Sequence, residues 1–267
     1  MNRLKNFALN RPILFGLVLI FIYAILGALT YPAHFLFPES EVGQLYGDAL
    51  SKFIIFLCFL FILWRFGWVK ASRFNRLGNI HTWIIVIIIL VYKIPLELYA
   101  FTGDFAIKFP NSPLAMANLV FSLQTSLVEE TIFRALVFVA MILTWGETKY
   151  GQIKAVVLSS LFFGVMHMIN ILIRPLGVVL FQAIVVSLPG ILYGALLLSR
   201  KSLWPAIALH WLTNAAVNIK LMGNDAFQET LSMWIIYAII LIPIVVYSAF
   251  LIWKLPKSHR YDEEEAG

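Results

Sequence analysis

The chain alternates long apolar stretches with short polar ones along its whole length. About eight stretches hold the roughly 20 mostly apolar residues that an α-helix needs to cross a bilayer. They run approximately over residues 12–30, 50–69, 80–101, 115–145, 153–172, 176–199, 203–221 and 231–254. This pattern predicts an all-α fold, a polytopic membrane helix bundle with about eight transmembrane helices.

The composition supports an integral membrane protein. Of the 267 residues, 61% are hydrophobic and only 13% are charged, and the mean hydropathy is +0.87. No polar stretch is long enough to form a separate domain. We therefore expect one transmembrane domain over residues 1–256 and a short polar, acidic cytoplasmic tail over residues 257–267. We interpret the basic N-terminus and the first apolar stretch as a retained span, because no small-residue cleavage site follows.

The positions of the charges predict the orientation. The net charge of +6 comes from Lys and Arg that flank the apolar stretches, as membrane topology requires, so we expect no nucleic-acid partner. These residues precede the first stretch and follow the second, fourth, sixth and eighth, whereas the intervening loops are mostly acidic. Because cytoplasmic loops are enriched in Lys and Arg, both termini are predicted to be cytoplasmic.

Three of the apolar stretches contain polar residues that a bilayer normally excludes. A charge at the centre of a spanning helix costs roughly 2.5 to 3.5 kcal/mol, so these groups must face one another or a wet cavity. The residues are Glu129, Glu130 and Arg134 in the fourth stretch, His167 in the fifth, and His210 and Asn214 in the seventh.

Helical spacing groups these residues. Glu130 and Arg134 are four apart and share a face, so they can neutralise each other. Glu129 points about 100° away and is left without a partner on its own helix. His210 and Asn214 are also four apart, and they present hydrogen-bond donors side by side.

Together these groups can hydrolyse an amide bond. A desolvated carboxylate beside an imidazole can deprotonate water, and we expect Glu129 and His167 to do so. The oxyanion that follows needs fixed donors, which His210 and Asn214 would supply. Phe163, four residues before His167, could form a wall of the same site.

The same residues allow other interpretations. Glu130 and Arg134 can be a purely structural ion pair. Two histidines and a glutamate could bind zinc, but no H-E-x-x-H pair is present and the single Cys58 offers no cysteine cluster, so we expect no cofactor while zinc stays possible. Ser126 and Ser160 are more simply small residues at helix contacts.

The ordered motifs E-E-x-x-x-R (Glu129, Glu130, Arg134), F-x-x-x-H (Phe163, His167) and H-x-x-x-N (His210, Asn214) resemble those of the CAAX protease and bacteriocin-processing family (CPBP or Abi), which includes the prenyl-protein endopeptidases. The likeness covers about residues 115–220. It implies a glutamate-dependent intramembrane protease in which Glu129 and His167 activate water and His210 and Asn214 bind the oxyanion. Glu130, Arg134 and Phe163 would then support the site.

The expected substrate is a membrane-associated peptide or protein, and the oligomeric state is left open. The multi-pass chain shows no eukaryotic targeting features, which favours a bacterial cytoplasmic (inner) membrane. Two alternatives remain. A non-catalytic scaffold or immunity protein could keep the same fold, and Glu and His in membrane spans also build proton-coupled transporters.

Overall fold

The computed structural model describes residues 3–102, 112–221 and 231–255, and within these ranges it contains helices and loops but no strand. The elements are α1 (Arg3–Asn10), α2 (Pro12–Thr30), η1 (Tyr31–Leu36), α3 (Glu41–Phe66), α4 (Ile80–Thr102), α5 (Ser112–Glu130), η2 (Thr131–Phe138), α6 (Val139–Trp145), α7 (Lys149–His167), η3 (Met168–Leu172), α8 (Leu176–Arg200), α9 (Trp204–Leu221) and α10 (Leu231–Trp253).

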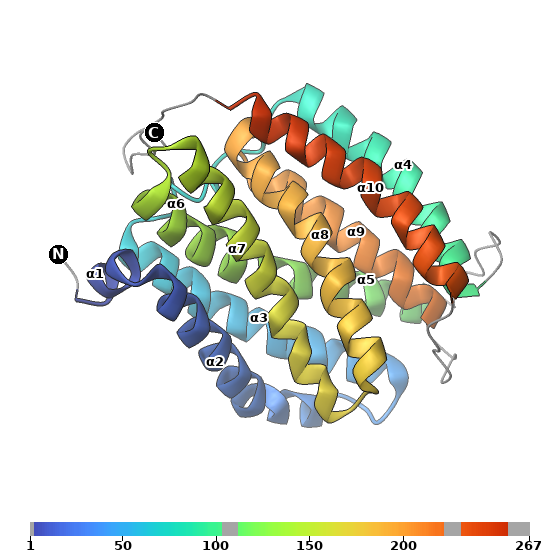
Figure 1. Cartoon of the computed structure of the whole chain (residues 1–267). Helices are drawn as coiled ribbons and strands as arrows, with labels where there is room; N and C mark the ends of the chain where they lie inside the picture. The colour runs from blue at the N-terminus through green and yellow to red at the C-terminus, as the bar shows by residue number, and fades with distance from the viewer. Residues whose placement is uncertain (1–2, 103–111, 222–230, 256–267) are drawn as a thin grey trace.

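The helices form one bundle around the continuous helical segment α5–η2–α6 (Figure 1). Helix α5 packs between α3 and α9, and η2 contacts α2, α3, α7 and α8. The remaining helices extend the bundle, because α7 packs on α8, α8 on α10, and α10 and α9 on α4. All eight residues of η2, including the charged Arg134, are buried. A helix that is buried all round is the core of its bundle, and the candidate site lies at this core.

The predicted fold class is confirmed. Each predicted apolar stretch is helical, and within the described residues six helical segments are long and apolar enough to cross a membrane. The segments over 115–145 and 203–221 are also helical but are not among these six. They carry most of the candidate site residues, whose polarity lowers their hydropathy, and their crossing stays a prediction. The predicted tail, 257–267, lies outside the described residues.

Two helices begin earlier than their hydropathy predicts. Helix α3 starts at Glu41 rather than near residue 50, because the side chain of Ser40 caps it by accepting from the backbone N–H of Gly43 at 3.1 Å. Such a cap satisfies one of the free N–H groups at a helix start. Thr148 caps α7 in the same way. Both extra segments are polar, so apolar length alone could not predict them.

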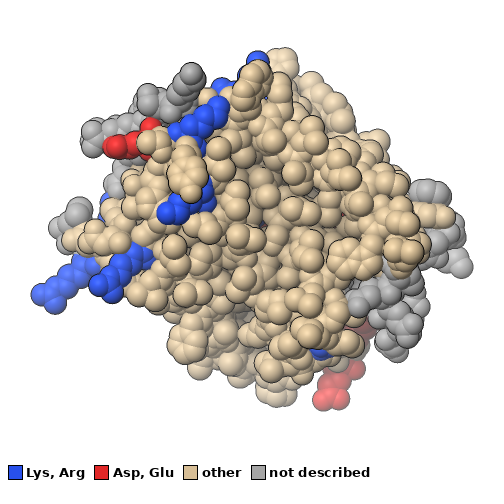
Figure 2. Space-filling model, viewed as in Figure 1, with Lys and Arg blue, Asp and Glu red and all other residues tan. Residues whose placement is uncertain are grey.

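The surface matches a protein surrounded by lipid. Many large apolar side chains of α2, α3, α4 and α10 are exposed, whereas a soluble protein rarely exposes such wide apolar areas. In Figure 2, most of the visible Lys and Arg lie at the end of the molecule that carries α1 and α6, and the broad side face is almost uncharged. The molecule is therefore an integral membrane protein with a basic end.

Candidate active site

The site begins where α5 changes its helical geometry. Glu129 and Glu130 are the last residues of α5, and the π-helical segment η2 follows directly. π-helical turns inside α-helices are rare and occur often at functional sites. The change of winding occurs between the two glutamates and Arg134, at the centre of the bundle.

Glu130 is the fixed carboxylate of the site. It is fully buried, and its Oε1 accepts from Nδ1 of His210 at 2.9 Å and from Nη1 of Arg134 at 3.4 Å. A second contact joins Arg134 Nε to Glu130 Oε2 at 3.3 Å, without hydrogen-bond geometry. The predicted pairing of Glu130 with Arg134 is thus present. The contact with His210 links α5 to α9 across 80 positions of sequence.

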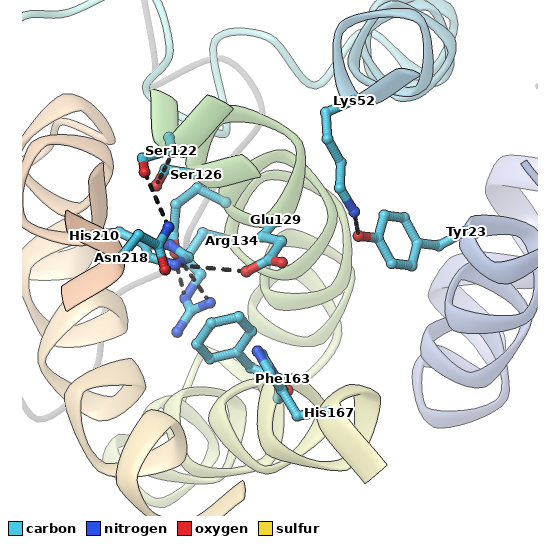
Figure 3. Close-up of polar contacts among 11 residues, drawn as sticks. Tyr23, Lys52, Ser122, Ser126, Glu129, Arg134, Phe163, His167, His210 and Asn218 are labelled. Carbon is cyan, nitrogen blue, oxygen red and sulfur yellow. Dashed lines mark hydrogen bonds and ion pairs between the residues drawn. The ribbon is translucent and has the colours of Figure 1, made fainter. Parts of the chain in front are cut away.

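Glu129 faces Nε2, the other ring nitrogen of His210. Its Oε2 lies 3.5 Å from Nε2 of His210 (Figure 3), so the imidazole stands between two carboxylates. Glu129 keeps 5% of its surface exposed, whereas Glu130 has none. A carboxylate oxygen accepts from an imidazole N–H, so Nδ1 of His210 is the donor to Glu130.

Aromatic rings and a glycine enclose Arg134. The guanidinium carbon lies 4.7 Å from the ring centroid of Phe163 and 5.3 Å from that of Tyr193, at cation–π distances. A Cβ at Gly190 would lie only 2.7 Å from Nη2 of Arg134. The backbone of α8 therefore approaches the guanidinium closely, which only glycine permits. The ring of Tyr193 also stacks on His210, with centroids 5.9 Å apart.

His167 lies on the other side of Phe163. The Phe163 ring is edge-on to His167, with centroids 5.0 Å apart, and to His210, with centroids 5.5 Å apart. Nδ1 of His167 lies 2.9 Å from the carbonyl oxygen of Phe163. A carbonyl oxygen only accepts, so Nδ1 carries the proton and Nε2 keeps its lone pair. Phe163 thus forms the expected wall.

The pairing of the glutamate with a histidine differs from the expected one. Among the described residues, the polar contact of Glu129 is with His210 rather than with His167. The reason is the neighbourhood of α5, which packs directly against α9. Apart from Asn214, the motif residues of the three helices gather at one place, with Phe163 between the two imidazoles.

Other predicted polar residues have separate positions. Asn214 is half-buried, and the structure gives it no hydrogen bond to another described residue. Asn218 donates to Ser122 at 3.2 Å, and Asn170 donates to Gln182 at 2.9 Å, so both join neighbouring helices. Ser126 and Ser160 each donate to a carbonyl oxygen four residues earlier in their own helix, as small residues at helix contacts do.

Two further pairs of residues, each with a charged side chain inside a predicted span, were missed from sequence. Lys52 of α3 donates to the hydroxyl of Tyr23 of α2, and both groups interact electrostatically with Glu129. In the view of Figure 3 this pair lies on the side of Glu129 away from His210. Lys93 and Glu97 form a second buried ion pair within α4. A charged residue inside an apolar stretch was the available signal in each case.

Within the described residues, no group of three or more His, Cys, Asp or Glu side chains is arranged to hold a metal ion. The described cluster is a chain of polar contacts from Arg134 through Glu130 and His210 to Glu129. Such an arrangement can hold and move a proton in a site that excludes most water.

Comparison with known proteins assigns the segment that contains this cluster. Neither the curated proteins nor the solved structures gave a significant match to the chain. The family model described as type II CAAX prenyl endopeptidase Rce1-like matches residues 111–216, close to the predicted range of 115–220. These residues include all three motifs, on α5–η2, α7 and α9. The segment that carries the three motifs is therefore similar to the Rce1-like type II CAAX prenyl endopeptidases.

Proposed function

We propose that this protein is an intramembrane endopeptidase that hydrolyses a peptide bond of a membrane-associated peptide or protein, with water activated by Glu129. The observation that carries the proposal is the pair of carboxylates around His210. One is completely buried, and the other keeps a small exposed area. Glu130 is fully buried and engaged by Arg134 and His210. Glu129 is the one that keeps a small exposed area, so it is the carboxylate that a water molecule can reach.

Glu129 acts as the general base. One of its oxygens faces His210, which leaves the other for a water molecule. A carboxylate in a largely dry site removes a proton from water more readily than one in bulk solvent. His167 assists from the other side of Phe163, because the lone pair on its Nε2 can accept a hydrogen bond from the same water.

His210 and Asn214 stabilise the oxyanion. Glu130 fixes the ring of His210 through Nδ1, so the Nε2 proton is shared with Glu129 at rest. When Glu129 takes up the proton of the water, its attraction for that Nε2 proton falls. His210 can then donate to the negative oxygen that forms on the substrate carbonyl, and the side-chain amide of Asn214, one turn further along α9, adds a second donor.

The remaining step returns the proton. Water oxygen bonds to the carbonyl carbon, and the resulting tetrahedral intermediate collapses as the carbon–nitrogen bond breaks. Glu129 gives the proton to the leaving amine, which yields a free carboxyl group and a free amino group. No serine or cysteine nucleophile is needed. For a multi-pass protein of this kind we propose a bacterial cytoplasmic membrane as the location.

The proposal is tested by cleavage of membrane-anchored peptides with fluorescent reporters by the purified protein in liposomes. Glu129→Gln keeps the size of the side chain but removes the base, so the rate should fall by about 10²- to 10⁴-fold. The matched control is Glu41→Gln, the same exchange at an exposed position at the start of α3, which should cleave like wild type.

Cleavage in the presence of a metal chelator tests whether the protein uses zinc. Cleavage by wild type should be unchanged by a chelator if Glu129 and the histidines act on water alone. Unaltered cleavage by Glu129→Gln would refute the proposed mechanism. Loss of cleavage with chelator, restored by added zinc, would assign the histidines and Glu129 to a metal instead.

A further inference from the structure

A cavity lies at the basic end of the bundle, and no candidate active-site residue lines it. Its volume is about 510 Å³, within the range of about 300 to 1,000 Å³ that small-molecule sites occupy. Residues of α6, α7, α8, α10 and the loop after α3 line it. None of the residues assigned above to peptide hydrolysis is among them.

The cavity is strongly cationic. The described residues that line it include four cationic side chains and no Asp or Glu: Arg73, Arg200, Lys201 and Lys254. Arg73 is also almost completely buried, with 2% of its surface exposed. Collecting four positive charges around one space costs free energy through mutual repulsion. A cavity of this kind is suited to an anionic ligand.

Two of these cations occupy an unfavourable backbone conformation. Arg73 has φ of 59° and Lys201 has φ of 55°, and they are the only non-glycine residues with positive φ in the described part of the chain. Residues with a Cβ rarely have positive φ, whereas glycine adopts this conformation readily. The chain does use glycine at Gly67 and Gly78, which also have positive φ. Two of the four cations beside the cavity thus stand at backbone positions that favour glycine.

Two buried polar atoms of the lining residues have no partner. Nε of Arg200 is a buried donor without an acceptor, and Oε1 of Gln152 is a buried acceptor without a donor. The amide nitrogen of Gln152 is already used, since it donates to the carbonyl oxygen of Gly146 at 3.0 Å. Buried groups of this kind are normally hydrogen-bonded. A ligand that fits both must offer an anionic acceptor and a hydroxyl or ammonium donor.

Much of the remaining wall is apolar. Leu198, Phe250, Leu251 and Leu255 line the cavity beside the cations, and Phe250 is about half exposed. Basic pockets between membrane helices on the cytoplasmic side typically bind phospholipid headgroups. An apolar exit toward the lipid fits a molecule whose charged head enters the protein while its chains stay outside.

We propose that this cavity binds the headgroup of an anionic phospholipid from the surrounding membrane. The phosphate lies against Arg200, Lys201 and Lys254, and a headgroup hydroxyl donates to Gln152. The acyl chains leave over Phe250. Such a lipid joins the ends of α8 and α10 to the loop after α3.

Native mass spectrometry of the full-length protein, titrated with phosphatidylglycerol or phosphatidylcholine, tests this assignment. Wild type should bind one phosphatidylglycerol in clear preference to phosphatidylcholine. Because each Lys or Arg near a membrane surface contributes about 1 kcal/mol toward an anionic lipid, Arg200→Gln with Lys254→Gln should weaken this binding by about 30-fold. The matched control, Arg11→Gln with Lys70→Gln, removes two exposed cations outside the cavity and should change the affinity by less than about twofold.

The variant Lys201→Gly distinguishes a loss of lipid affinity from a loss of folding stability. Glycine fits the positive φ better than lysine, so the variant should be at least as resistant to heat as wild type. Its affinity for phosphatidylglycerol should nevertheless fall by about fivefold, as the loss of one such charge predicts. A variant that binds the lipid as well as wild type would show that Lys201 serves no anion, and the proposal would be wrong.

Two other anions would overturn the assignment. If glycerol phosphate displaces the lipid at equal concentration, the site recognises a free phosphate compound and not a membrane lipid. The acidic run 262–265 follows the last lining residue closely in sequence. If wild type shows no preference for phosphatidylglycerol, and neutralising Asp262 and Glu263–Glu265 to amides creates one, the chain's own tail occupies the cavity.

Discussion

His210 is the residue through which the two glutamates of the site are coupled, because each of its ring nitrogens faces a different carboxylate. A proton gained or lost on Glu129 therefore changes the field at Glu130 and at Arg134. In the proposed mechanism, this coupling gives the buried ion pair a role in the chemistry as well as in stability. A structural role and a catalytic role of Glu130 and Arg134 are compatible.

The first prediction at this scale concerns that ion pair. Arg134→Met leaves Glu130 as a buried carboxylate with no cation beside it, and breaking a buried pair from one side costs about 3 to 5 kcal/mol. The free energy of unfolding in mixed detergent micelles should fall by that amount. The double variant Glu130→Gln with Arg134→Met contains no buried charge at these positions, so it should recover most of the lost stability.

Activity should not recover with stability. The amide introduced by Glu130→Gln can still accept from His210 but no longer stabilises a positive imidazole, so the double variant should cleave at least about tenfold more slowly than wild type. A double variant as active as wild type would reduce the pair to a structural role. A single variant as stable as wild type would show that the pair adds nothing to folding.

The identities of these residues could be predicted from sequence, but not all of their partners could. Glu129, Glu130 and His210 stand out because charged and polar groups are expensive in apolar stretches. The choice between His167 and His210 as the neighbour of Glu129 depends on how α9 and α7 pack around α5, and one sequence does not contain that information. Lys52 was overlooked because it falls near the edge of the predicted span 50–69, whereas α3 extends back to Glu41.

At the scale of elements, the site depends on the close approach of α8 to η2. Helix α8 contains a Pro189–Gly190 pair, which disfavours helix continuation, yet α8 continues through it as a helix. The structure gives Gly190 a different role, because its missing side chain leaves room for the guanidinium of Arg134. The π-helical winding of η2 was likewise not predicted, since its apolar residues show no break in sequence.

Gly190→Ala tests this approach. The added methyl group would lie 2.7 Å from Nη2 of Arg134 and 3.2 Å from Cβ of Ser160, and the guanidinium is fully buried against the rings of Phe163 and Tyr193. We expect a loss of stability of about 1 to 3 kcal/mol, as for overpacked cores, together with slower peptide cleavage. Thermal unfolding and cleavage rate of the purified protein measure both effects.

The control is Gly27→Ala in α2, where the added methyl group meets nothing within 4 Å. Alanine favours a helix over glycine by about 1 kcal/mol, so this variant should be as stable as wild type or slightly more so, with unchanged cleavage. If Gly190→Ala behaves like Gly27→Ala, the close packing of α8 against Arg134 is not what holds the site.

At the scale of the whole molecule, hydrogen bonds bring the first and last helices to the same end of the bundle. The hydroxyl of Thr144 donates to the carbonyl of Leu9 at 2.9 Å, and Lys149 donates to the carbonyl of Trp253 at 2.6 Å. The start of the chain, the junction of α6 and α7, and the end of α10 therefore share one level. If both ends lie on one side of the membrane, the number of crossings is even, which the basic loops also predict.

Helix α7 with η3 offers the sharpest test of orientation. Tyr150 and Ile173 lie at its two ends and are exposed by 76% and 80%, and the segment Lys149–Leu172 is apolar enough to cross a membrane. The single native Cys58 can be replaced by alanine, after which Tyr150→Cys and Ile173→Cys each carry one thiol. Because the basic end is predicted to be cytoplasmic, a membrane-impermeant maleimide should label Tyr150→Cys only in inverted vesicles and Ile173→Cys only in intact cells. The reverse pattern would invert the orientation, and labelling of both from one side would mean that α7 does not cross the membrane.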